Sequence, residues 1–210
     1  MRIIAGAKRG MKLLSPKTQD SRPITDRVKE SLFSVLYKYD LPAERTVADL
    51  FCGVGSLGIE ALSRGAQFVT FVENDLKTIA VLEKNIEKAG FVKESKVITA
   101  NAFKIGAPVD FIRRLVRRSE SEVGSLGKGG EHKYDLIFVD PPYSTAKDVG
   151  KNFRLSGLLN LLSEQSAADG IVVVRTHRRT ELLEQYGRFE VIERRQWGTM
   201  AVTILITGSS

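Results

Sequence analysis

Cysteine and histidine are scarce in this sequence. The 210 residues include one cysteine, Cys52, and two histidines. A single cysteine excludes an internal disulfide, and a lone thiol is typical of proteins in a reducing compartment such as the cytoplasm. One cysteine and two histidines also cannot build the usual four-ligand His/Cys zinc site. We therefore expect neither a disulfide framework nor a metal site.

Long hydrophobic segments are also missing. No apolar run approaches the roughly 20 residues that a helix needs to cross a bilayer. The N-terminal residues 1–6 have no long apolar stretch behind their charge, so a secretory signal is not expected. Hydrophobic residues make up 42% and charged residues 27% of the chain, which is ordinary for a soluble globular protein. We expect a cytoplasmic monomer with no membrane partner.

Positive charge exceeds negative charge. The chain has 32 Lys and Arg against 25 Asp and Glu, a net charge of +7 at pH 7. Such an excess favours a polyanionic partner such as nucleic acid. Many globular proteins are mildly basic, however, so charge alone does not identify that partner.

Strand and helix patterns alternate from Thr46 onward. Strands are predicted at 47–51, 68–73, 96–100, 134–139 and 171–174, with helices ending near Arg64 and spanning 76–89, about 108–118 and 154–168. This alternation predicts an α/β fold with a mostly parallel sheet and helices on both faces. Two further strands, 189–195 and 201–207, are separated by only five residues, so they must form an antiparallel pair.

The remaining segments have their own composition. Residues 1–20 are basic and contain glycines, which predicts a small β-hairpin extension on a domain formed by residues 21–210. A helix follows, with Thr25 or Asp26 as its N-cap. Residues 119–133 are rich in Gly, Ser and charge, and we interpret them as a flexible surface insertion.

The tetrapeptide Asp140-Pro141-Pro142-Tyr143 directly follows a predicted buried strand. Two prolines end the strand rigidly, and the residue before a proline is held in an extended conformation. The carboxylate is therefore presented at the carboxyl edge of the sheet, where open α/β sheets bind ligands. Asp140 and the Pro141 carbonyl can accept hydrogen bonds from an amine, and Tyr143 can stack on a ring. The motif therefore predicts a site for a flat base that carries an amino group.

A glycine-rich loop follows the first predicted strand. The pattern Gly53-x-Gly55-x-x-Gly58 allows a tight turn and a close approach of a ligand to the backbone. Glu73 ends the next strand ~20 residues later, where a carboxylate can accept from ribose hydroxyl groups. These features fit both NAD and S-adenosylmethionine.

Three other features favour S-adenosylmethionine. Asp49 precedes the glycine turn, where a carboxylate can face a cationic amine or sulfonium. Asn101 and Ala102 follow the third strand, where an amide or the backbone can read an adenine edge. Asp140 occupies the end of the fourth strand, and hydride transfer has no obvious need for such a group.

Four stretches of the chain resemble one known family. They are residues 1–6, 22–33, 49–66 and 134–143. Together they are similar to the bacterial 16S ribosomal RNA guanine-N2 methyltransferases of the RsmD type, over nearly the whole chain except 119–133. The resemblance implies a Rossmann-like class I methyltransferase fold with a seven-stranded, mostly parallel sheet and an antiparallel last strand. It also implies S-adenosylmethionine as the cofactor.

The resemblance assigns roles to individual residues. Gly53 and Gly55 are expected near the methionine portion of the cofactor, and Glu73 at the ribose. The family often has aspartate at the adenine contact, where this chain has Asn101. The full set of expected cofactor contacts is Thr25, Arg27, Asp49, Gly53, Gly55, Glu73, Asn74, Asn101 and Ala102.

The predicted reaction is N2-methylation of a guanine in small-subunit ribosomal RNA, either free or in an assembling subunit. Asp140 and Pro141 are expected to hold the amine, with Tyr143 stacked on a base that has left its own stack. The expected substrate contacts are Arg2, Lys8, Arg9, Lys12, Arg22 and Pro142. A further basic cluster lies at 175–179.

Other functions stay open at this stage. A DNA adenine-N6 methyltransferase shares the Asp-Pro-Pro-Tyr motif, although 210 residues leave little room for a separate target-recognition region. Protein glutamine methyltransferases use similar chemistry but usually have Asn at the position of Asp140. A non-catalytic RNA-binding module could retain the fold, and an NAD dehydrogenase fits least.

Overall fold

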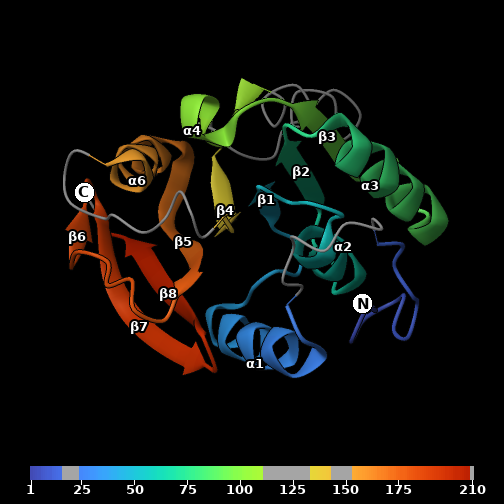
Figure 1. Ribbon diagram of the computed structural model, residues 1–210, viewed down its shortest axis with the longest axis horizontal. Coiled ribbons are helices and arrows are strands. Elements are labelled where there is room, and N and C mark those ends of the chain that lie inside the picture. The colour runs from blue at the N-terminus through green and yellow to red at the C-terminus, as the bar shows by residue number, and fades with distance from the viewer. Residues whose placement is uncertain (16–23, 111–132, 143–152, 209–210) are drawn as a thin grey trace, which may run out of the picture.

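One mixed β-sheet runs through the described part of this computed structural model, residues 1–15, 24–110, 133–142 and 153–208 (Figure 1). Its strands are β1 Thr46–Leu50, β2 Phe68–Glu73, β3 Ser95–Thr99, β4 Tyr134–Val139, β5 Ser166–His177, β6 Gln185–Tyr186, β7 Phe189–Trp197 and β8 Met200–Thr207. Their order across the sheet is β3-β2-β1-β4-β5-β8-β7-β6.

The sheet changes from parallel to antiparallel at β5. β3, β2, β1, β4 and β5 pair in parallel, whereas β8 pairs antiparallel with both β5 and β7. The predicted α/β fold with an antiparallel C-terminal strand is therefore confirmed. The expected count of seven strands is one too few, because Gln185 and Tyr186 pair with β7 as the short strand β6. Two residues are too few to show a strand periodicity in the sequence.

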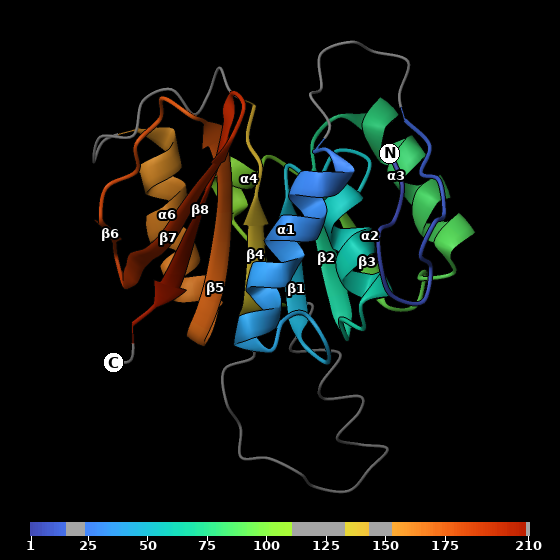
Figure 2. The same cartoon turned by 90° about the horizontal axis from the view of Figure 1, so that it is seen from below.

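Helices cover both faces of the sheet (Figures 1 and 2). In chain order the helices are α1 (Asp26–Leu36), the 3-10 turn η1 (Tyr37–Tyr39), α2 (Ser56–Ser63), α3 (Leu76–Ala89), α4 (Ala102–Ile105) and α6 (Arg154–Gln165). α1, α2 and α3 share one core with sheet residues such as Phe71 and Phe138. α4 and α6 share the other core with Leu50 and Val139. The alternation of side chains along each strand divides the core in this way.

Local capping sets the helix bounds. The Thr25 side chain accepts a hydrogen bond from Val28 N and is the N-cap of α1. Thr25 is one of the two N-cap positions predicted from the sequence. Asp75 caps α3, and Gly90, with φ of 75°, ends it, so the predicted bounds of this helix are confirmed. α6 ends at Gln165 rather than near 168, because Ser166 already pairs with Tyr134 as part of β5.

The N-terminal segment, residues 1–15, is packed against the helical layer. It folds back on itself through the antiparallel bridge between Arg2 and Lys12 and the bond from Ile3 N to Met11 O. Ile3 and Leu13 are buried in the same core as α1, α2 and α3. Both views place this segment beside α2 and α3, at the far end of the molecule from β6 (Figures 1 and 2).

Several predictions fall outside the described residues: Arg22, Tyr143, residues 111–118 of the expected basic helix, and residues 119–132 of the expected insertion. Within the described residues, no helix has both the length and the apolar character that a membrane crossing requires.

Candidate active site

The candidate site lies at the carboxyl edge of the parallel strands. β1 and β4 are neighbours, and the chain continues from β1 to β2 on one side and from β4 to β5 on the other. This is the point where the strand order reverses, which is where open α/β sheets leave a crevice for ligands. Asp140 N donates to Leu50 O at 3.3 Å, so the chain after β4 stays beside the chain after β1.

The loop after β1 has a left-handed backbone at three positions: Phe51 (φ 56°), Gly53 (φ 54°) and Gly55 (φ 84°). A side chain at Gly55 would clash with Leu82, so this glycine is needed for packing as well as for its φ. A Cβ at Gly53 would meet no atom within 4 Å. Gly53 therefore leaves its backbone accessible to a ligand.

Asp49 is almost fully buried, with 1% of its surface exposed. Its Oδ2 accepts a hydrogen bond from Gly58 N at 2.8 Å, near the start of α2. Burial, together with the nearby carboxylates of Asp140 and Glu73, raises the pKa of Asp49 to about 8, while the Gly58 N–H and Arg175 act in the opposite direction. A cation bound beside this carboxyl group would favour its ionised form.

Glu73 links the end of β2 to the glycine loop. Its Oε2 accepts from Gly53 N at 3.0 Å, and its Oε1 accepts from Asn74 N at 2.8 Å and Asp75 N at 3.0 Å. The carboxylate is thereby fixed beside the accessible backbone of Gly53. Asn74 is exposed at the same edge.

Asp140 is bound by a residue that sequence reasoning placed only in a basic cluster. Arg175 Nε donates to Asp140 Oδ1 at 2.6 Å, and the two side chains are 14% and 20% exposed. Burial raises the pKa of Asp140, while the Arg175 guanidinium lowers it. Pro141 is buried and Pro142 exposed. The position of Arg175, directly after the apolar run 171–174, was the available signal that it reaches the same sheet edge.

The other predicted cofactor residues border this edge. Asn101 is exposed, and its side chain accepts from Phe103 N at 3.0 Å as the cap of α4. Ala102 is buried. Phe103 lies against Phe51, with ring centroids 4.8 Å apart, which ties the α4 start to the glycine loop. Thr25 and Arg27 are both exposed at the start of α1.

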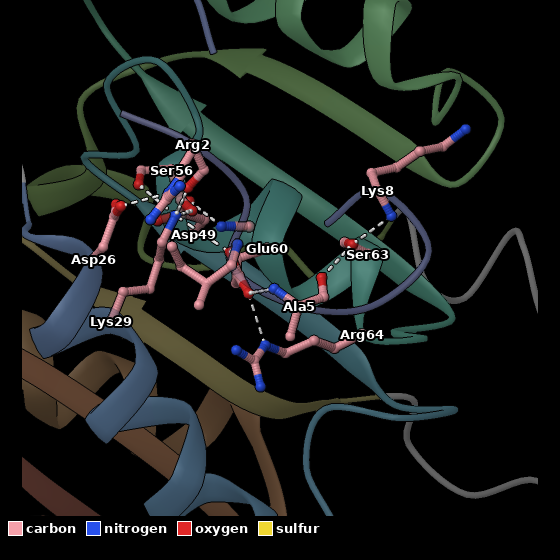
Figure 3. Close-up of polar contacts among 12 residues, drawn as sticks. Arg2, Ala5, Lys8, Asp26, Lys29, Asp49, Ser56, Glu60, Ser63 and Arg64 are labelled. Atoms are coloured by element: carbon pink, nitrogen blue, oxygen red, sulfur yellow. Dashed lines mark hydrogen bonds and ion pairs between the residues drawn. The ribbon is translucent and has the colours of Figure 1, made fainter. Parts of the chain in front are cut away.

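Sequence reasoning missed a buried ion pair under the N-terminal segment (Figure 3). Lys29 and Glu60 have fully buried side chains, and Lys29 Nζ lies 3.2 Å from Glu60 Oε2. Glu60 also accepts from Ile4 N and Ala5 N, and Lys29 Nζ donates to Arg2 O at 2.7 Å. The pair therefore holds the N-terminal segment to α1 and α2. An acid within the apolar run 57–62 was the signal that could have revealed it.

Asn85 of α3 joins the N-terminal segment to the glycine loop. Its amide nitrogen donates to Leu14 O and to Val54 O, both at 3.1 Å, and its oxygen accepts from Leu14 N at 2.8 Å. Asn85 is fully buried, so these bonds satisfy it in place of water. One side chain thus contacts both the segment and the loop between Gly53 and Gly55.

The predicted RNA-binding side chains of the N-terminal segment lie at its surface. Arg2, Arg9 and Lys12 are exposed and Lys8 is partly exposed. Arg2 pairs with Asp26 at 2.7 Å, and Lys8 Nζ lies 5.8 Å from the centre of the Phe91 ring. The segment is held by its backbone, which leaves these basic side chains on the outside.

The strand order, the glycine loop after β1 and the Asp-Pro-Pro sequence after β4 define a class I methyltransferase fold. The chain belongs to the family described as "Conserved hypothetical protein 95", whose model matches residues 1–206. Relatives named "Ribosomal RNA small subunit methyltransferase D" confirm the predicted resemblance to RsmD-type methyltransferases.

Individual relatives agree with this assignment. The Bacillus subtilis protein named "Putative rRNA methyltransferase YlbH" is 34% identical over 206 residues, covering 97% of each chain. The Escherichia coli K12 "Ribosomal RNA small subunit methyltransferase D" is 37% identical over 145 residues, which are 68% of this chain and 60% of that protein. The solved structure of "Putative methyltransferase yhhF from Escherichia coli" has a TM-score of 0.72 at 26% identity, covering 100% of this chain and 99% of the other.

Proposed function

We propose that this protein transfers a methyl group from S-adenosylmethionine to the N2 amine of a guanine in small-subunit ribosomal RNA. The observation that carries the proposal is the placement of Asp140 beside Asp49 and Glu73 at one sheet edge. An acceptor for a base amine therefore lies next to a loop suited to a nucleoside cofactor. The names of the relatives above support ribosomal RNA as the substrate class.

The site residues fit S-adenosylmethionine. Asp49, Glu73 and Asp140 bring three carboxyl groups to this edge, and a cofactor with a cationic amine and a sulfonium would favour their ionised forms. Gly53 lets a ligand approach the backbone, and Glu73 beside it is an acceptor for ribose hydroxyl groups. When bound, the cofactor supplies an activated methyl group on its sulfonium.

Positioning is the main task of the protein in this reaction. The lone pair of an exocyclic guanine amine is delocalised into the ring, so the amine is a poor nucleophile. Asp140 Oδ2 and the Pro141 carbonyl can accept its two N–H bonds and turn the lone pair out of the ring plane. Fixed geometry removes much of the entropic barrier, and acceptors near the amine stabilise the positive charge that develops on nitrogen.

Base capture and RNA binding complete the proposal. Tyr143, which lies outside the described residues, is predicted to stack on the flipped base, an interaction worth about 1–3 kcal/mol. We propose that residues 1–20 extend the methyltransferase domain of residues 21–210 toward RNA phosphates, using the side chains of Arg2, Lys8, Arg9, Lys12 and Arg22. A monomeric state and a reducing, cytoplasmic location belong to the same proposal.

A DNA adenine-N6 methyltransferase is the second candidate, because Asp140-Pro-Pro would hold either amine. The test offers labelled S-adenosylmethionine with small-subunit RNA, small subunits from cells lacking the enzyme, and duplex DNA, and identifies the methylated nucleoside by mass. N2-methylguanosine in the RNA or subunit is expected. N6-methyladenine in DNA, with unmodified RNA and subunits, would establish the second candidate instead.

Asp140→Ala tests the catalytic assignment. We expect methyl transfer to be abolished, with cofactor affinity changed by no more than roughly tenfold, about 1.4 kcal/mol, because Asp140 holds the base rather than the cofactor. Asp110→Ala, at an exposed position, is the matched control and should keep normal activity. Near-normal turnover by Asp140→Ala would remove Asp140 from the mechanism.

A further inference from the structure

The contact between Arg175 and Asp140 follows from the register of two neighbouring strands. β5 pairs in parallel with β4, and Val174 lies opposite Val139. The next residues are Arg175, still within β5, and Asp140, the first residue after β4, so the two lie side by side where β4 ends. On its other side β5 pairs with β8, and Arg175 Nη1 lies 3.8 Å from Met200 Sδ. The guanidinium therefore contacts Met200 of β8 as well as Asp140.

The ion pair gives the two carboxylate oxygens of Asp140 different surroundings. Arg175 Nε donates to Oδ1 at 2.6 Å. No described residue donates a hydrogen bond to Oδ2 in this structure. One oxygen is therefore fixed by a charged donor, and the other is left as an acceptor. A carboxylate fixed in this way has lost rotational freedom before any substrate arrives.

Burial and Arg175 act on the ionisation of Asp140 in opposite directions. The same groups act on the neighbouring Asp49, whose pKa is raised by the charges of Asp140 and Glu73 and lowered by that of Arg175. Burial favours the neutral form of Asp140, and a protonated carboxyl is a poor acceptor for an amine. Arg175 acts against this effect by stabilising the ionised form.

We propose that Arg175 is a positioning residue for methyl transfer: by binding Oδ1 it keeps Asp140 ionised and presents Oδ2 to the amine of the target base. This inference rests on the proposed function of Asp140. It assigns to Arg175 a role in the site rather than in the RNA-binding surface suggested by its basic neighbours at 175–179.

The test compares Arg175→Gln and Arg175→Lys with Arg45→Gln. Arg45 forms an ion pair with Asp135 near the opposite end of β4, at 3.8 Å and with half of its side chain exposed. It therefore controls for loss of an Arg–Asp contact on the same strand away from the site. Gln removes the positive charge, whereas Lys retains it and loses the fixed planar donor.

We expect Arg175→Gln to lower kcat by about tenfold to a hundredfold, the usual range for losing a hydrogen bond between charged groups. The KM for RNA and the Kd for cofactor should change by less than about threefold, since Arg175 acts through Asp140. The acid limb of the kcat–pH profile should move to higher pH, because Asp140 without the Arg175 charge becomes ionised only at a higher pH. Arg175→Lys should restore much of the limb position, and Arg45→Gln should resemble the unchanged protein.

A second readout does not depend on activity. The carboxyl carbon of Asp140, assigned by its loss in Asp140→Asn, can be titrated by carbon NMR, and Arg175→Gln should raise its pKa relative to Arg45→Gln. An unchanged titration and an unchanged profile would overturn the inference, as would an increase in kcat, which would mean that Arg175 blocks Asp140. If the unchanged protein methylates neither RNA nor subunits, the proposed function fails, while the titration still decides whether Arg175 controls the ionisation of Asp140.

Discussion

The buried Lys29–Glu60 pair gives a sharp prediction because its two members have different neighbours. Glu60→Ala removes the partner of a fully buried ammonium and the acceptor of Ile4 N and Ala5 N. Breaking a buried ion pair in this way costs about 3–5 kcal/mol. For a domain of this size that is roughly 6–20 °C in Tm.

Lys29→Met should cost less, about 1–3 kcal/mol. It leaves Glu60 with the two backbone N–H groups and with Arg64, whose Nε donates to Oε1 at 2.8 Å. The double variant Lys29→Met/Glu60→Gln has neither buried charge, so its loss should be smaller than the sum of the two single losses. Leaving one buried charge without its partner should thus lower the free energy of unfolding more than removing both charges together.

Urea unfolding at 25 °C, followed by circular dichroism, measures these differences. Glu83→Ala on the exposed surface of α3 is the control and should change the free energy of unfolding by less than about 0.5 kcal/mol. Two results would refute the reasoning: Glu60→Ala within about 1 kcal/mol of the unchanged protein, or Lys29→Met less stable than Glu60→Ala. Either would mean that water or a rearranged N-terminal segment satisfies the charge.

Two further predictions concern the cofactor and RNA surfaces. The folded pKa of Asp49, about 8, lies above its usual value of 3.8, so Asp49 contributes stability at low pH that is lost progressively as pH rises from 3.8 to about 8. Asp49→Asn should therefore lose less Tm between pH 5 and 9, and coincident Tm–pH curves would contradict the burial effect. Replacing Lys8, Arg9 and Lys12 together by Gln keeps the backbone contacts of the segment, and should reduce the salt-dependence slope of RNA binding by up to about 2; an unchanged slope, measured by fluorescence anisotropy, would place the RNA elsewhere.

Strong periodic signals were enough to predict much of the fold. The bounds of β4 and α3 agree with the sequence because one is a continuous apolar run and the other has an apolar stripe closed by Gly90. The antiparallel β7–β8 pair followed from the short connection between the strands. The glycine loop, Glu73 and Asp140 could be placed at one edge because the carboxyl ends of parallel strands lie together.

The missed residues are charged side chains whose environment depends on distant parts of the chain. Lys29 adjoins Val28 on an amphipathic helix, where a lysine ordinarily marks the solvent face. It is buried because α2 and residues 1–15 pack over it. The helical pattern of α1 alone does not show that these segments cover it. Arg175 was grouped with its basic neighbours because only the register of β5 against β4 shows that it reaches Asp140.

The docking of the N-terminal segment also has a consequence for how the chain folds. Ile4 and Ala5 bind Glu60 across 56 and 55 residues, and Leu14 binds Asn85 across 71 residues. During synthesis these first residues therefore leave the ribosome long before their partners exist, and their hydrogen bonds must wait for α2 and α3. The N-terminal segment can thus be fixed to the rest of the fold only after Glu60 and Asn85 have been synthesised.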